Sequence, residues 1–189
     1  IVDGGSLFST VTITEAGLIQ DISITIEGIE HSAVGDLVAE LRYLGKDGPS
    51  EGGMEPAYLF FRPNVGGTTL PGSLSNLNGD YTFSTNPDDD DFWTEAAIPS
   101  DETVDSSLTY YASDANGQFL DLASEDFFGG FDTRGDWQLV ISDENAIGNN
   151  VGSVQGWTVR FGTTVIPEPS AFFLLYLGCG TAILGRRRR

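Results

Sequence analysis

Carboxylates in loops are the side chains of this chain best suited to chemistry, because they outnumber every other reactive group. The 189 residues include 28 Asp and Glu but one His and one Cys. Calcium takes about six to eight oxygen ligands from carboxylates and loop carbonyls, and extracellular modules bind it weakly. Three segments offer such ligands: Asp88, Asp89, Asp90 and Asp91; Asp114 with Asn116; and Asp143 with Asn145. We predict weak calcium binding there. The alternative is a solvated acidic loop, because no segment has the full Asp-x-Asp-x-Asp-Gly spacing.

Histidine limits the catalysis that this chain can support. A Ser-His-Asp or Cys-His arrangement would need His31, the single imidazole. No Gly-x-Ser-x-Gly segment accompanies it, and no His/Cys cluster offers a zinc site. A glycosidase-type carboxylate pair stays open among 28 acids, but no motif selects one. We expect His31 to be hydrogen-bonded between strand ends, and we expect no catalytic site and no cofactor other than calcium.

Aromatic side chains offer a second kind of ligand site. Phe92 and Trp93 directly follow the acidic run, where exposed rings would form a binding platform for a sugar. Phe127, Phe128 and Phe131 lie in a later segment flanked by glycines. For these three we favour a core plug beneath a loop over an exposed platform.

The charge of the chain excludes one class of partner. Residues 1–165 carry 27 acidic and five basic residues, a net charge of −22. Nucleic-acid binding requires clustered Lys and Arg, so no nucleic-acid partner is expected. Strong negative charge favours solubility outside the cell, cation binding or repulsion between neighbouring copies. The single Cys179 lies in the apolar C-terminal segment, so the preceding residues form no disulfide.

The elements that must position these groups are strands. Apolar and polar residues alternate in four segments, 22–26, 37–44, 137–142 and 157–162, and shorter candidates are 11–14, 58–61 and 81–84. Period-two alternation of β-branched and aromatic residues is typical of half-buried strands. No segment before residue 166 keeps a 3.6-residue apolar period. We therefore predict an all-β sandwich, with Trp137 and Trp157 in its core. Two long connections, 85–105 and 112–134, are expected to be functional or mobile.

The C-terminal segment combines three features in order: Pro167, Glu168 and Pro169; an apolar run; and Arg186, Arg187, Arg188 and Arg189. Residues 170–185 would span about 24 Å as a helix, against about 30 Å for the hydrocarbon core, and flanking arginines can cover the difference. The arginines would hold the C-terminus on the cytoplasmic side. We therefore divide the chain into a sandwich (1–163), a Pro-Glu-Pro linker (164–169), a transmembrane helix (170–185) and a basic cytoplasmic tail (186–189).

This tripartite segment resembles the PEP-CTERM sorting signal of Gram-negative bacteria. The resemblance implies export, retention in the inner membrane and removal of the tail by an exosortase-type enzyme. It also implies a place at the cell surface or in the extracellular matrix, in association with exopolysaccharide. Because the chain begins at Ile1 without a secretory leader, we expect that a leader was removed or truncated.

Two segments of the predicted sandwich carry a second resemblance. They are DISITIEGIEHSAVGDLVAEL, residues 21–41, and GDWQLVISDENAIGNNVGSVQGWTVRF, residues 135–161. Together they resemble the P domain (P/Homo B domain) that follows the catalytic domain of kexin- and furin-like subtilases. This resemblance implies a jelly-roll β-sandwich of about eight strands.

Three functions are consistent with these observations. The first is an exported, non-catalytic surface or matrix protein that binds or scaffolds exopolysaccharide. The second is the accessory P domain of a subtilisin-like serine endopeptidase whose catalytic part is absent from this chain. The third is a carbohydrate-binding module on the same scaffold.

Overall fold

The computed structural model describes residues 1–45, 56–61, 75–96, 102–114, 117–144 and 152–164. The described residues form strands β1 (Ser6–Ile13), β2 (Leu18–His31), β3 (Leu37–Gly45), β4 (Ala57–Phe61), β5 (Leu77–Ser84), β6 (Thr109–Tyr111), β7 (Gly135–Asp143) and β8 (Gly156–Thr164). The 3-10 helix η1 (Val34–Asp36) and the short helix α1 (Phe92–Ala96) are the helices of this part of the chain. The prediction of an all-β body is confirmed.

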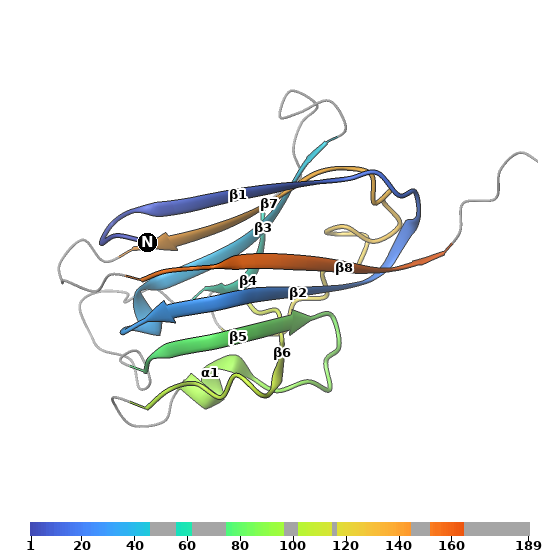
Figure 1. Ribbon diagram of the computed structural model, residues 1–189. Helices are drawn as coiled ribbons and strands as arrows, with labels where there is room; N and C mark the ends of the chain where they lie inside the picture. Colours follow the sequence, from blue (N-terminus) through green and yellow to red (C-terminus); the bar gives the residue numbers. More distant parts are fainter. Residues whose placement is uncertain (46–55, 62–74, 97–101, 115–116, 145–151, 165–189) are drawn as a thin grey trace, which may run out of the picture.

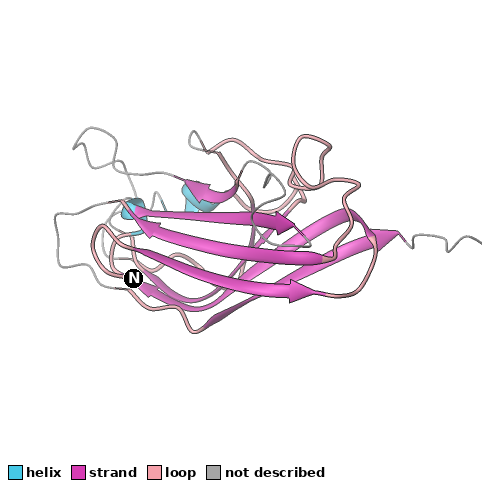
Figure 2. Cartoon of the chain, turned by 90° about the horizontal axis from the view of Figure 1, so that it is seen from above, coloured by secondary structure: helices cyan, strands magenta, loops and turns pink. Residues whose placement is uncertain are grey.

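The strands form two four-stranded sheets, in the orders β1-β7-β3-β4 and β6-β5-β2-β8. Neighbours are antiparallel except β5 and β6, which are parallel. Five of the seven connections between consecutive strands pass from one sheet to the other. Figures 1 and 2 show the resulting layers, with α1 beside β5 and β6. The predicted sandwich is therefore present.

One core lies between the two sheets. Ile22, Ile24 and Ile26 of β2 are fully buried, as their alternation predicts, because successive side chains of a strand point to opposite faces. Ring contacts join the sheets: the Phe60 and Phe83 centroids are 5.4 Å apart. The centroid of Trp137 on β7 is 4.9 Å from that of Phe161 on β8. Trp137 is fully buried, as predicted, whereas Trp157 is half-buried and packs against the core edge.

The long connection between β6 and β7 contains the predicted aromatic plug. The Phe128 side chain is fully buried, and its ring centroid is 5.1 Å from that of Trp137. Phe127 is half-buried against the core, so the prediction of a plug is confirmed for these two residues. For Phe131 it is wrong, because this residue ends the turn on the solvent side and is 39% exposed.

Among the described residues, no helix is long and apolar enough to cross a membrane. The predicted transmembrane helix at 170–185 lies outside the described residues. So do the residues of the predicted sorting signal: Pro167, Glu168, Pro169, Arg186, Arg187, Arg188 and Arg189.

Candidate functional site

The acidic run starts a helix. Asp91 accepts a hydrogen bond from the backbone N–H of Trp93 at 2.9 Å through Oδ1, and one from the Thr94 hydroxyl at 2.9 Å through Oδ2. This is the geometry of an N-cap, in which a side-chain oxygen satisfies the orphan donors of the first turn. Both oxygens of the Asp91 carboxylate therefore accept hydrogen bonds from residues of α1.

The other aspartates of the run are arranged as a turn between β5 and α1. Asp89 accepts hydrogen bonds from the Ser84 hydroxyl and, at 3.0 Å, from the Asn86 side-chain amide. Asp90 forms a parallel β-bridge with Tyr110 through its backbone. Asp88 is exposed. The four carboxylates thus do not converge on one point.

The other predicted calcium ligands are also separated. Asp114 Oδ1 accepts the Gln118 N–H at 2.8 Å and closes a local turn, and Asp143 lies in a buried pair described below. Asn116 and Asn145 lie outside the described residues. Within the described ranges, no group of three His, Cys, Asp or Glu side chains is arranged to hold a metal ion. Calcium binding stays a prediction.

Phe92 and Trp93 are not an exposed platform, so that prediction is wrong. Their exposed fractions are 0% and 4%. Phe92 stacks on Phe60 with ring centroids 4.9 Å apart, and Trp93 meets the edge of the same ring. The physical reason is the Asp91 cap, which begins a helix whose first residues face the core although the preceding loop is polar.

His31 and Asp143 form a buried pair at the ends of two strands. His31 Nε2 is 3.3 Å from Asp143 Oδ2, and both side chains are fully buried. His31 Nδ1 lies 3.0 Å from the carbonyl oxygen of Ala33 and 3.2 Å from its backbone nitrogen, so the bond there depends on the tautomer. The prediction that His31 is hydrogen-bonded between strand ends is confirmed.

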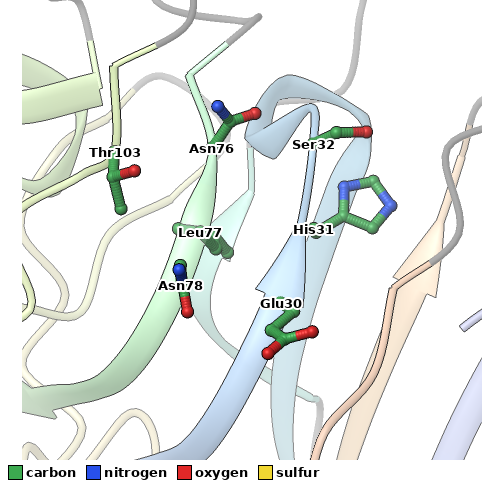
Figure 3. Close-up of a pocket in the computed structure, with 7 residues that line it drawn as sticks. All are labelled: Glu30, His31, Ser32, Asn76, Leu77, Asn78 and Thr103. Atoms are coloured by element: carbon green, nitrogen blue, oxygen red, sulfur yellow. The ribbon is translucent and has the colours of Figure 1, made fainter.

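A polar pocket of about 460 Å³ opens at the same end of the β6-β5-β2-β8 sheet. Its lining consists of Glu30, His31, Ser32, Asn76, Leu77, Asn78 and Thr103. Figure 3 shows the β5 residues in the middle, with Thr103 on one side and the β2 end on the other. The His31 ring lies on the far side from Thr103.

Strand register explains which side chains line this pocket. Glu30 pairs with Asn78, and His31 pairs with Leu77, so these two pairs point to opposite faces. His31 and Leu77 are buried, which leaves Glu30 and Asn78 on the outer face, where both are exposed.

The segment on the far side of β5 is fixed by backbone bonds. The Asn76 N–H donates to the Glu102 carbonyl at 2.9 Å, and the Val104 N–H donates to the Asn76 carbonyl at 3.0 Å. Below them, the Tyr81 hydroxyl donates to the Val104 carbonyl at 2.8 Å. Thr103 is therefore held beside β5, and the pocket is built on paired backbone.

The chemistry of the pocket is recognition of polar groups. It presents one carboxylate, two amides and two hydroxyls, and no Lys, Arg or Cys is found among the described residues of its lining. Amides and hydroxyls both donate and accept hydrogen bonds, a carboxylate accepts them, and these are the bonds that a sugar hydroxyl makes. Sequence reasoning missed this site because its residues come from three separated segments with no motif. The pairing of β5 with β2 and the bridge between Asn76 and Thr103 bring these three segments together.

Comparisons with known proteins leave the family open. No protein-family profile matches the chain. No curated protein matches it either. The chain is similar to the serine protease of Aeromonas sobria in complex with its chaperone ORF2, with 16% identity and a TM-score of 0.43, over 87% of this chain and 24% of that one. It is also similar to the crystal structure of the same serine protease, with 14% identity and a TM-score of 0.42, over 85% of this chain and 24% of that one. The chain thus spans about a quarter of these structures, and TM-scores below 0.5 do not establish a shared fold.

Proposed function

We propose that this chain is an exported, non-catalytic surface or matrix protein whose sandwich binds exopolysaccharide through the polar pocket. The observation that carries the proposal is the pocket itself, because hydroxyl, amide and carboxylate groups gather there at the ends of β2 and β5 and on the segments beside them. Ligand sites built on strands hold their groups in place better than sites on loops. Glu30 and the net charge of −19 favour a neutral or amine-bearing sugar over an acidic one.

The placement of His31 supports a non-catalytic role. General-base catalysis requires the imidazole to reach a substrate proton. The single imidazole of the chain is 3% exposed and is bonded to Asp143. His31 thus serves the structure, and the exposed polar groups of the pocket are the ones that we assign to binding.

Affinity measurements test the binding proposal. Isothermal titration of the 189-residue chain with exopolysaccharide from the producing organism should show saturable binding. Replacing Asn78 by Ala removes one or two hydrogen bonds, each worth about 1 kcal/mol, and should weaken affinity about fivefold or more. Gln118→Ala, at an exposed position outside the pocket lining, is the matched control and should bind normally. Equal affinity for all three proteins would refute a role of the pocket.

Sorting through the C-terminus is the second part of the proposal. It rests on the resemblance of residues 166–189 to the PEP-CTERM signal, and it requires an exosortase-type enzyme and passage through the inner membrane. Cell fractionation with intact-mass measurement tests it. The surface form should lack Arg186 to Arg189, whereas a cytoplasmic protein that still ends at Arg189 would exclude sorting.

An accessory role in a serine protease is the alternative. The two segments that resemble the P domain meet in the structure, because β2 pairs with β8 and β3 pairs with β7. A jelly-roll sandwich would suit that role, which also requires a catalytic domain encoded upstream. The gene sequence before Ile1 discriminates the surface protein from the accessory domain. A subtilisin-like domain there supports the accessory role, and a leader of about 20 to 30 residues dismisses it.

A further inference from the structure

β1 is an edge strand with unusual composition for this chain. It pairs with β7 on one side and lies at the edge of its sheet on the other. Its eight residues, SLFSTVTI, carry no charge. Every other described strand of eight or more residues carries at least one charged side chain. The net charge of the chain is −19, so a neutral edge of this length is an exception.

The edge also lacks the other features that keep strands apart. Natural sheets protect their edges with charges, proline, bulges or very short strands. The β1–β7 ladder runs from Ser6 to Ile13 without a register shift, whereas the β2–β5, β2–β8, β3–β4 and β3–β7 ladders each contain one. The other edge strands are β4 and β6, which are five and three residues long, and β8, which has nine residues, carries Arg160 and pairs with β2 through a shifted ladder. Among the described strands, β1 is thus the long edge with neither a charge nor a register shift.

Apolar side chains are exposed along this edge. Phe8 is 60% exposed and Val11 is 36% exposed, and Val2, just before the strand, is 64% exposed. With Phe131 they make up the exposed large hydrophobic residues of the described chain. Three of these four thus lie on or beside one strand, which marks an interaction surface.

A neutral groove runs beside the first half of β1. It has a volume of about 200 Å³ and is lined by Leu7, Phe8, Ser9, Val154, Gln155, Gly156 and Trp157. The indole N–H of Trp157 donates to the Ser9 hydroxyl at 3.0 Å, so two of the residues that line the groove are joined to each other. An apolar side chain that enters this groove would contact Leu7 and Trp157 without meeting a charge.

We propose that β1 docks on β1 of a second copy of this chain, in antiparallel orientation about a two-fold axis. With Ser9 opposite Ser9 of the second copy, Leu7 faces Val11 and Phe8 faces Thr10. These pairs lie on matching faces, because side chains alternate along a strand, and Leu7 and Val11 lie an even number of residues apart. Val11 of each copy then lies beside the groove at Leu7 of the other. The two sheets become one continuous sheet through both copies.

The match of the neutral, regular strand β1 with itself, and not the charge of the whole chain, favours a second copy as the occupant. Two copies of a strongly acidic protein repel each other over most of their surfaces, and β1 is the long strand through which they can meet without opposing charges. A two-fold interface uses the same patch on both partners, as a strand that pairs with itself does. Added salt should therefore strengthen this association, because it screens the remaining repulsion.

Sedimentation velocity of the 189-residue chain tests the proposal. The wild type should sediment as a dimer, more completely at high salt. Phe8→Lys and Val11→Lys, both at exposed positions, should give monomers with an unchanged far-UV circular dichroism spectrum. Gln118→Lys adds the same charge at an exposed site outside β1 and should stay dimeric.

Hydrogen exchange provides a second measurement that does not depend on the variants. Exchange at those β1 amides that do not bond to β7 should slow as wild-type concentration rises. A wild type that stays monomeric, or edge variants that associate as strongly as the wild type, would overturn the proposal. The latter result would place the association elsewhere in the chain.

Discussion

His31 and Asp143 connect the two sheets of the sandwich through a buried hydrogen bond, 3.3 Å from Nε2 to Oδ2. His31 ends β2 in one sheet, and Asp143 ends β7 in the other. The pair therefore holds together the end of the sandwich at which the polar pocket opens. Glu30 of the pocket is the residue before His31, which places the pocket beside this bond.

Removing the imidazole should destabilise the protein. His31→Ala leaves the buried Asp143 carboxylate without one of its partners, and breaking a buried pair costs about 3 kcal/mol. Urea denaturation should show this loss in the free energy of unfolding, with Glu125→Gln at an exposed turn position as the control. A loss no larger than that of the control would mean that the bond does not support the fold.

Gly152 should not tolerate a side chain. A Cβ at this position would lie 2.6 Å from the Glu30 carbonyl oxygen and 2.6 Å from His31 Cδ2. Gly152→Ala therefore displaces the backbone from the His31 ring and should cost about 1 to 3 kcal/mol, as overpacking does. Gly130→Ala is a useful comparison, since a Cβ there meets no atom within 4 Å, although its φ of +74° adds backbone strain. Thermal denaturation of both variants measures the difference; a smaller loss for Gly152→Ala than for Gly130→Ala would contradict the predicted overpacking.

The acidic run should stabilise the protein through the Asp91 cap of α1 and not through its negative charge. Asp91→Ala removes the N-cap of α1 and should cost about 1 kcal/mol, whereas Asp88→Ala at an exposed position should cost little. Denaturation of each variant with and without calcium checks both this role and the predicted metal site. If calcium stabilises the wild type and the Asp88 variant loses that effect, the run binds the ion after all.

Two buried tyrosines should make the protein sensitive to alkali. Burial raises the pKa of Tyr81 and Tyr110 above the ordinary value of 10.0, and Asp105 raises both further. The unfolded chain then releases these protons first. The stabilisation is thus complete below about pH 10 and is lost as the pH rises above it.

Urea midpoints across this range measure the effect. Tyr81→Phe removes the hydroxyl that bonds Val104, so it should lower stability at neutral pH and flatten the alkaline slope. If the stability of the variant falls with rising pH as steeply as that of the wild type, groups other than Tyr81 cause the alkaline slope.

The sandwich strands were predictable because their signal is local. The alternation of Ile22, Ile24 and Ile26 defines one buried face without knowledge of any partner strand. β6 was not predictable, because three residues cannot show alternation and its pairing with β5 is long-range. Helix α1 is likewise too short, at five residues, to show a helical period.

The candidate site was less predictable than the fold. Glu30, Asn78 and Thr103 carry no motif, and only strand register brings them to one end of the sheet. Phe92 was misplaced because a polar sequence neighbourhood indicates exposure only on average, whereas the Asp91 cap turns this residue inward. His31 was predictable because a lone imidazole between strand ends had few other uses.

Mapping the bound ligand by NMR tests the central claim most directly. Chemical shifts of the 189-residue chain would be followed during titration with oligosaccharide fragments of the exopolysaccharide. The polar pocket predicts saturable shifts at Glu30, Ser32, Asn76, Asn78 and Thr103, weakened in Asn78→Ala and kept in Gln118→Ala. Saturable shifts confined to another surface, or no shifts at any concentration, would contradict it.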